Sequence, residues 1–470
     1  MADATLVQQL AAFVAAASYD ELPADVAASA PERVLDIVGL CLGALDLDTS
    51  QAALDWVADA GGRTEATVIG ARTRAPAAQA AFANGVLAHS LDYDDTHLPS
   101  VLHPSASVVP AALAAAQATG ASGRDLLTAV ATGVEVCVRL GMAGFDRAAG
   151  QSLFFERGQH ATSICGAIGS AAAAGRLLGL AEDGIADAMG LAVSMSGGVI
   201  EANRTGGTVK RLHCGWAAHA GVTAAQLARR GFTGPPTVLE GRFGFYEAYL
   251  SGRYEPAEIT LSLGDRWALA GIHYKPYPAN HFTHAVVDAA LALRAGGLRA
   301  RDVAAVEIGV ATPTVRTIGE PLEAKRRPPS GYSAKFSGHY VFAAALLGGA
   351  GLGVGSADFT DLMVVDPARL RLMDLVTVVS SAECDALYPH VLPAVVRVTC
   401  TDGSVREVKV LTNRGGPARP LTAAELDAKF IENAVPAVDP GTARRLADDL
   451  RRLPELDLAE DALLELEETS

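Results

Sequence analysis

From residue 5 to about residue 260, apolar residues recur at every third and fourth position, which is the spacing of one face of an α-helix. A second apolar stripe within this stretch runs from Leu126 to Val138, after Ser122, a residue type that caps helix N-termini. Helical periodicity returns from Thr422 onward. We therefore expect helices in both stretches, with their apolar stripes buried. The first stripe contains Leu6, Leu10, Phe13, Val14 and Ala17.

The pattern changes after about residue 268. Residues 303–310 alternate as a strand does, and residues 394–400 and 405–411 flank an Asp402-Gly403 turn, which is typical of a β-hairpin. This segment is predicted to form a mixed α/β module. The chain is thus expected to be mainly α.

The composition narrows the classes of function. The chain has 470 residues, of which 50% are hydrophobic and 19% charged, so it can bury a large core. Its formal net charge of -15 is opposite to that of a typical nucleic-acid or anionic-membrane binder. The six cysteines form no C-x-x-C pair, which fits a reduced, cytoplasmic protein. No basic segment precedes the first apolar stretch, and no apolar run reaches the ~18 residues of a membrane span, so we expect neither secretion nor membrane insertion.

Candidate chemistry begins in a polar segment between His89 and His103, which contains three histidines and three aspartates, Asp92 among them. A nearby carboxylate raises the proton affinity of an imidazole, so such a segment can hold a proton donor and acceptor in place. Metal binding and a solvated capping loop are the competing interpretations. The spacing matches no metal motif, and no metal is predicted.

Two further motifs carry histidines. His160, in Gly-Gln-His-Ala-Thr, would by itself more often be a buried core histidine with its hydrogen bonds satisfied. Residues 203–219 contain a Gly-Gly loop that leads into a helix, with Arg204, Lys210 and His213 beside it. Backbone N–H groups and these cations predict a site for a carboxylate or phosphate.

A fourth motif, residues 273–284, contains Lys275 and His281 between prolines that restrict the backbone. Only six of the 38 basic residues are lysine, so each lysine suggests a need for a compact or titratable ammonium group. The chain has neither a nucleotide-binding fingerprint nor a nucleophile elbow. Its clustered cations and proton carriers instead favour a small polyanionic acid as the substrate. Proton abstraction beside a carboxylate needs a base, an acid and charge-offsetting cations, which these residues supply.

Taken in order, five segments resemble the MmgE/PrpD family, which includes 2-methylcitrate dehydratase, cis-aconitate decarboxylase and iminodisuccinate epimerase. The matching segments are AFANGVLAHSLDYDDTH with HPSASVVPA (81–111), GQHATS, GGTVKRLHCGWAAHAG, KPYPANHFTH and AKFSGHY (334–340).

The resemblance implies a large, discontinuous all-helical domain over 1–268, completed by 403–470, and a smaller α/β lid over 269–402. It also implies a homodimer that uses no cofactor, with an active site between the two domains. The residues that it assigns to catalysis are His103, Asp92, His160, Lys210 and Lys275, with His103 transferring the proton and Asp92 orienting it. Those expected to bind substrate are Thr96, Arg204, His213, Lys275, His281 and Tyr340.

We expect an enzyme, a hydro-lyase similar to 2-methylcitrate dehydratase that acts on a small di- or tricarboxylate. An epimerase or a decarboxylase of the same family is the alternative. Where the decarboxylase branch carries a histidine after its lid lysine, this chain has Asn280, and the loop over residues 92–97 is closer to epimerase-like members. A non-catalytic anion-binding protein and a metal-dependent hydrolase are the readings from other classes.

Overall fold

The structure is a computed structural model that describes residues 4–71, 73–202 and 206–468. The chain divides into two compact units, residues 1–272 with 433–470 and residues 273–432. The sequence placed the second boundary after residue 402, inside the turn of a hairpin. Strand pairing explains the difference, because β7 (Ala394–Cys400) pairs with β8 (Val405–Val410) and keeps both strands in the second unit.

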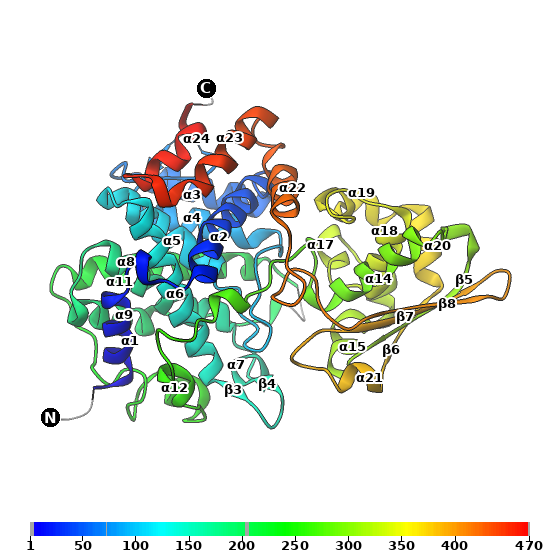
Figure 1. Cartoon of the computed structure of the whole chain (residues 1–470), viewed down its shortest axis with the longest axis horizontal. Coiled ribbons are helices and arrows are strands. Elements are labelled where there is room, and N and C mark those ends of the chain that lie inside the picture. The colour runs from blue at the N-terminus through cyan, green and yellow to red at the C-terminus, as the bar shows by residue number, and fades with distance from the viewer. Residues whose placement is uncertain (1–3, 72, 203–205, 469–470) are drawn as a thin grey trace. The chain divides into compact units, whose positions relative to one another are not determined.

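The first unit is built of helices, as the periodicity predicted (Figure 1). Two short antiparallel strand pairs interrupt the helices of this unit. They are β1 (Ala66–Thr67) with β2 (Arg74–Ala75), and β3 (Phe145–Asp146) with β4 (Gln151–Ser152). Its helices, up to the first unit boundary, are α1 (Leu6–Ala16), α2 (Ala24–Gly43), α3 (Asp48–Ala60), α4 (Ala77–Ser90), α5 (Ser105–Thr119), α6 (Gly123–Ala143), α7 (Leu153–Glu156), α8 (Ala161–Leu177), α9 (Glu182–Met195), α11 (Val209–Ala228), α12 (Phe245–Leu250) and α13 (Ala257–Thr260).

The last helices return to this unit. Here α23 (Pro440–Arg451) packs on α2, and α24 (Leu464–Glu468) follows. Arg451 forms an ion pair with Glu32 of α2 at 2.8 Å, and Leu446 and Leu450 are buried. The helical unit is therefore discontinuous in the sequence.

Glycines set the spacing of the helices that carry the polar motifs. A Cβ on Gly85 of α4 would lie 2.7 Å from the Cα of Gly215 in α11. On Gly133 of α6, a Cβ would lie 2.7 Å from the carbonyl oxygen of Gly169 in α8. Real Cβ atoms do not approach backbone atoms this closely. These helix pairs can therefore pack together only because glycine has no side chain.

Helix α6 is almost entirely buried within the first unit. Its N-cap is Ser122, whose hydroxyl accepts a hydrogen bond from the Asp125 N–H, as predicted. Among the described residues, α6 is the one continuous helix that is long and apolar enough to cross a membrane, and 94% of its apolar window is buried inside the protein. The pair α2 and α3 would meet the same criteria only as one span bent by 98°. The burial of α6 is that of a core helix.

The second unit contains a four-stranded sheet in the order β6-β5-β7-β8. Strand β5 (Val303–Val310) runs parallel to β6 (Val376–Ser380) and antiparallel to β7. The structure confirms the predicted strand and hairpin, and Gly403 in the turn has a φ of +84°. Strand β6 was not predicted. The helices are α14 (His284–Ala295), α15 (Thr312–Ile318), α16 (Leu322–Arg326), α17 (Gly331–Ala334), α18 (Gly338–Leu347), α19 (Asp361–Val364), α20 (Pro367–Asp374) and α21 (Ala382–Asp385), with α22 (Ala423–Ala434) reaching the second boundary.

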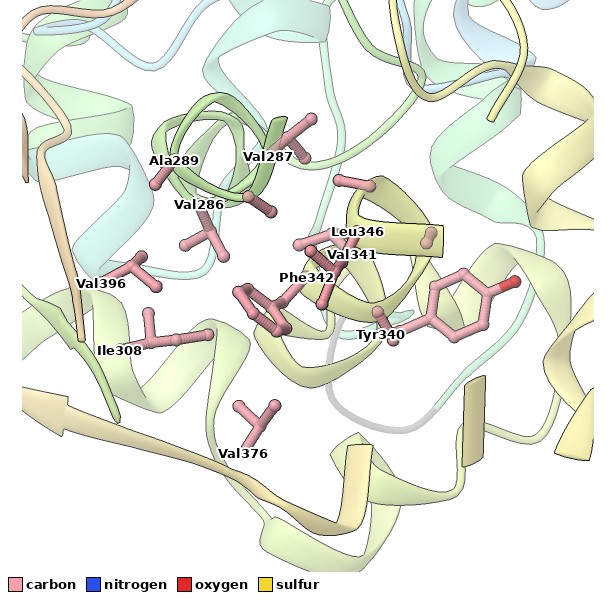
Figure 2. Packing of buried hydrophobic residues seen from close by; sticks show 14 of the residues in the cluster. Val286, Val287, Ala289, Ile308, Tyr340, Val341, Phe342, Leu346, Val376 and Val396 are labelled. Atoms are coloured by element: carbon pink, nitrogen blue, oxygen red, sulfur yellow. The ribbon is translucent and has the colours of Figure 1, made fainter. Parts of the chain in front are cut away.

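Helices α14 and α18 pack together against the sheet and bury its apolar side chains. Figure 2 shows Phe342 of α18 between Val286 of α14 and the strand residues Ile308 and Val376. All four side chains are no more than 2% exposed. The second unit therefore has its own hydrophobic core, which confirms the predicted fold class.

Substitution of Gly85 by Ala is expected to destabilise the protein by about 1–3 kcal/mol, because the new methyl group would overlap the α11 backbone. Urea-unfolding midpoints measure the effect. Gly175→Ala in α8 is the matched control, since its Cβ would meet side-chain atoms at 3.5 Å, an ordinary contact, and the change should stabilise by up to about 1 kcal/mol. Equal midpoints for the two variants would contradict the role given to the glycine contact.

Candidate active site

A loop between α4 and α5 forms one wall of the site, and the buried carboxylate of Asp95 anchors it. Asp95 accepts hydrogen bonds from the Ser105 hydroxyl at 2.5 Å and from Arg33 of α2 at 3.2 Å. Burial raises the pKa of Asp95 to about 6, although Arg33 and Ser105 pull it down. Within the loop, Asp92 has a φ of +53°, a conformation that Asp tolerates better than most residues. The loop is therefore held in one defined path.

Four buried imidazoles gather beside this loop, and we call them the histidine cluster: His89, His103, His160 and His213. The ring of His89 lies 5.3 Å from that of His103 and 5.7 Å from that of His160, centroid to centroid. The rings of His160 and His213 are 4.8 Å apart. Helix packing thus joins residues that are up to 124 positions apart in the sequence (from 89 to 213).

The contacts of His103 define its tautomer. Its Nδ1 lies 2.7 Å from the backbone carbonyl oxygen of Asp95, which can only accept, so Nδ1 carries the proton. The Thr96 hydroxyl lies 3.3 Å from the same nitrogen. In the neutral ring, Nε2 then has the lone pair that can receive a proton. Asp95 and Thr96 contact this nitrogen directly, and Asp94 Oδ2 lies 3.9 Å from it. The orienting role that the sequence assigned to Asp92 stays a prediction.

His160 and His213 share one hydrogen bond between their Nδ1 atoms, at 2.9 Å. Burial is the largest cause that lowers both pKa values, well below the usual range for His160 and to about 4 for His213. Positive neighbours, including Lys210, lower them further. Both rings are neutral near pH 7, so one must donate through Nδ1 and the other must accept.

Lys210 supplies a cation at the edge of the cluster. It lies in the first turn of α11, and its Nζ is 3.3 Å from the Asp92 carboxylate. Its side chain is 12% exposed and that of Asp92 only 2%. A mostly buried ammonium next to uncharged imidazoles suits an anionic ligand.

One group of described residues could hold a metal ion. Donor atoms of His89, Asp94 and Cys214 all lie within 4.8 Å of one another. Burial and the Asp94 carboxylate raise the pKa of the Cys214 thiol well above its usual value. A metal here would have to displace that proton, as at any zinc-bound cysteine, and would also replace the hydrogen bond between His89 and Asp94.

Two of the other predicted site residues lie in the second unit, and one falls outside the described residues. Lys275 and His281 lie in the second unit, where His281 is buried and stacks on His284 with ring centroids 4.5 Å apart. Arg204 falls outside the described residues.

Tyr340, which the resemblance expects to bind substrate, lies in the hydrophobic core of the second unit. Its hydroxyl donates to the carbonyl oxygen of Asp358 and accepts from Arg369 at 2.7 Å, and the side chain is fully buried. Figure 2 shows the hydroxyl directed away from the labelled aliphatic side chains. These internal partners use its hydrogen-bonding capacity for the fold.

His89 and Asp94 had no role assigned from the sequence, yet they contact each other within the cluster. His89 Nδ1 lies 2.7 Å from Asp94 Oδ2. Their five-residue spacing across the end of α4 was the available signal, since a helix end can fold a following carboxylate back onto its last turn.

The first unit thus brings together four buried imidazoles and a mostly buried ammonium group, a combination typical of enzyme active sites. Residues 8–257 match the model of the MmgE/PrpD N-terminal domain, and residues 277–453 match that of the C-terminal domain. The chain belongs to the MmgE/PrpD family, and it is an enzyme of the lyase kind.

Curated relatives cover most of the chain. Cis-aconitate decarboxylase of Homo sapiens is 32% identical over 82% of this chain and 78% of its own length. The enzyme of that name from Mus musculus is also 32% identical, over 82% of this chain and 77% of its own. A cis-aconitate decarboxylase-like protein of Aspergillus oryzae is 27% identical over 96% of this chain and 95% of its own.

The neutral state of His213 predicts a loss of stability in acid. Because its folded-state pKa of about 4 is below the unfolded value of about 6.5, the unfolded chain takes up the proton first as the pH falls, and stability is lost from about pH 6.5 down to 4. His213→Gln should remove about 1–2 kcal/mol of the loss between pH 7 and pH 5, measured by urea unfolding. The exposed His390→Gln is the control, which should lose as much stability as the unmodified chain. An unchanged loss in His213→Gln would show that this ring is not buried in its neutral form.

Proposed function

We propose that the chain decarboxylates cis-aconitate or a closely similar tricarboxylate, with the histidine cluster as its proton-transfer site. The observation that carries the proposal is the convergence of four buried imidazoles with Lys210 in one unit. The identity to relatives with that printed activity, over about four fifths of the chain, supports the choice of substrate.

The reaction needs one proton. The imidazolium of His103 donates a proton from Nε2 to an alkene carbon of the substrate. The electron pair of the breaking C–CO₂ bond then forms the new C=C bond, and carbon dioxide leaves. The product is a five-carbon unsaturated dicarboxylate, and His103 regains its proton from water.

The surrounding charges support this role for His103. Asp94 Oδ2 lies 3.9 Å from His103 Nδ1, so it stabilises the protonated ring. Lys210 offsets the charge of a substrate carboxylate, and Lys275 of the second unit is proposed to do the same. His160 and His213, uncharged near pH 7, act as hydrogen-bond partners of the substrate.

Dehydration of a 2-methylcitrate-like substrate is the second candidate, and Asn280 favours it. At this position, where the resemblance puts a histidine in decarboxylases, the Asn280 side chain accepts a hydrogen bond from the Phe282 N–H at 3.1 Å. Asn280 therefore caps a short helix. Unlike the histidine that the resemblance puts here in decarboxylases, its side chain does not titrate.

The substrate assay and a His103 variant together test the proposal. In D₂O, cis-aconitate should give carbon dioxide and a dicarboxylate that carries one deuterium at the carbon that accepts the proton, followed by NMR. EDTA should leave the rate unchanged, since no cofactor is proposed. An alkene from 2-methylcitrate, with no turnover of cis-aconitate, would favour the second candidate instead.

His103→Ala should lower kcat by about 10²–10⁴-fold, because it removes the proton donor. His97→Ala, in the same loop, is the control and should keep its activity. If His103→Ala folds and retains more than a tenth of the activity, His103 does not transfer the proton.

We also propose a cytoplasmic homodimer. The six buried free thiols support a reducing compartment. Helix α11 supports self-association, because Val209, Leu212 and Trp216 are each at least 40% exposed and lie on one helical stripe.

Trp216→Lys should therefore lower the sedimentation coefficient from that of a dimer to that of a monomer at micromolar concentration. Phe243→Lys is the control, because Phe243 is 89% exposed and lies off this stripe. A dimer that persists in Trp216→Lys would place the contact elsewhere, and a monomeric unmodified chain would contradict the dimer itself.

A further inference from the structure

One carboxylate oxygen in the histidine cluster lies between two imidazoles. Asp94 Oδ2 is 2.7 Å from His89 Nδ1 and 3.9 Å from His103 Nδ1. The first distance is that of a short hydrogen bond, and the second is an ion-pair distance that a small rotation of the side chain could close. The position of Asp94 is therefore set by the stronger contact, which is with His89.

The chemistry of His89 makes it the donor in this contact. The carboxylate can only accept, so His89 Nδ1 carries the proton. The other nitrogen, Nε2, is buried and has no hydrogen-bond partner among the described residues. The ring is 2% exposed, so its one defined hydrogen bond inside the cluster is the one that restrains Asp94.

We propose that His89 is a positioning residue: it holds the Asp94 carboxylate on its own Nδ1 and thereby keeps it from closing on His103. The inference rests on the proton-transfer role proposed for His103. It adds a residue that acts on that role without touching the substrate.

The physical reason is the steep distance dependence of a buried charge interaction. Without the His89 donor, Asp94 Oδ2 can turn toward His103 Nδ1, which lies 3.9 Å away and donates to the Asp95 carbonyl oxygen. Closing the gap from 3.9 Å to hydrogen-bond distance would stabilise the His103 imidazolium and raise its pKa by about one unit. His103 would then hold its proton too tightly to give it to carbon.

Other groups near His103 come from every element around the cluster. They are Asp92, Asp95 and Thr96 of the loop, Arg33 of α2, His160 and Thr162 of α8, and Lys210, His213 and Cys214 of α11. None of them changes in the variants below, so a shift in His103 reports on the restraint of Asp94.

Two substitutions of His89 separate its nitrogens. The side-chain NH₂ of Asn lies near the position of the histidine Nδ1, and that of Gln lies near Nε2. Both are polar and neither titrates, so the two variants have similar prospects of folding. His89→Asn keeps a donor for Asp94, whereas His89→Gln removes it from that position.

The measurement is an NMR titration of His103 in the full chain with ¹⁵N-labelled histidine. The His103 midpoint should rise by about one pH unit in His89→Gln and stay within about 0.3 unit of the unmodified chain in His89→Asn. In the double variant His89→Gln with Asp94→Asn, the rise should disappear, because the carboxylate is gone.

Kinetics provide the second readout. The limb of the kcat/KM profile that reports His103 should move to higher pH by the same amount in His89→Gln, with KM changed less than about threefold at the optimum. A His103 midpoint that does not move in His89→Gln, or that moves equally in both single variants, would overturn the proposal. The NMR shift does not depend on turnover, so loss of activity in His103→Ala tests the proposed function separately.

Discussion

The approach of α4 to α11 through two glycines is the constraint on which the site depends. Gly85 and Gly215 let the two backbones lie so close that a single methyl group would collide with the facing chain. This contact sets the distance between His89, at the end of α4, and His213, near the start of α11. The small residues in these helices therefore determine which polar groups can meet.

Burial then determines the charge state of the imidazoles that this packing brings together. Four imidazoles buried side by side cannot all be protonated, because desolvation and mutual repulsion both favour the neutral ring. The charges that remain are paired, Lys210 with Asp92 and Arg33 with Asp95. The cluster thus combines the neutral rings of His160 and His213 with the ammonium group of Lys210 and with His103, the proposed proton donor, an arrangement suited to a polycarboxylate substrate.

Much of the fold could be predicted, because its signals are local. Apolar spacing identified the helices, and the Asp402-Gly403 turn identified the hairpin, since only a few residue types adopt the required backbone conformation. Strand β6 has only five residues, and its burial alternates little. Its sequence therefore lacks the two-residue alternation that predicts a strand. The unit boundary was missed because strand pairing, a non-local interaction, keeps β8 with β7.

The candidate site was predictable in part for the same reason. Scarce histidines and lysines pointed to His103, His160, His213 and Lys210, and the structure brings these four into one unit. A sequence cannot show which way a side chain points, so the internal partners of Tyr340 and the contact of His89 with Asp94 were not predicted. Hydrogen-bond partners follow from packing, which the spacing of residues alone does not reveal.

The central claim is that the histidine cluster binds the substrate. Titration of cis-aconitate into the ¹⁵N-histidine-labelled chain tests this most directly, with His103, His160 and His213 assigned by single substitutions. The account predicts that their imidazole signals shift together with one dissociation constant while the exposed His390 does not respond. Turnover of the same substrate without any change in these signals would contradict it.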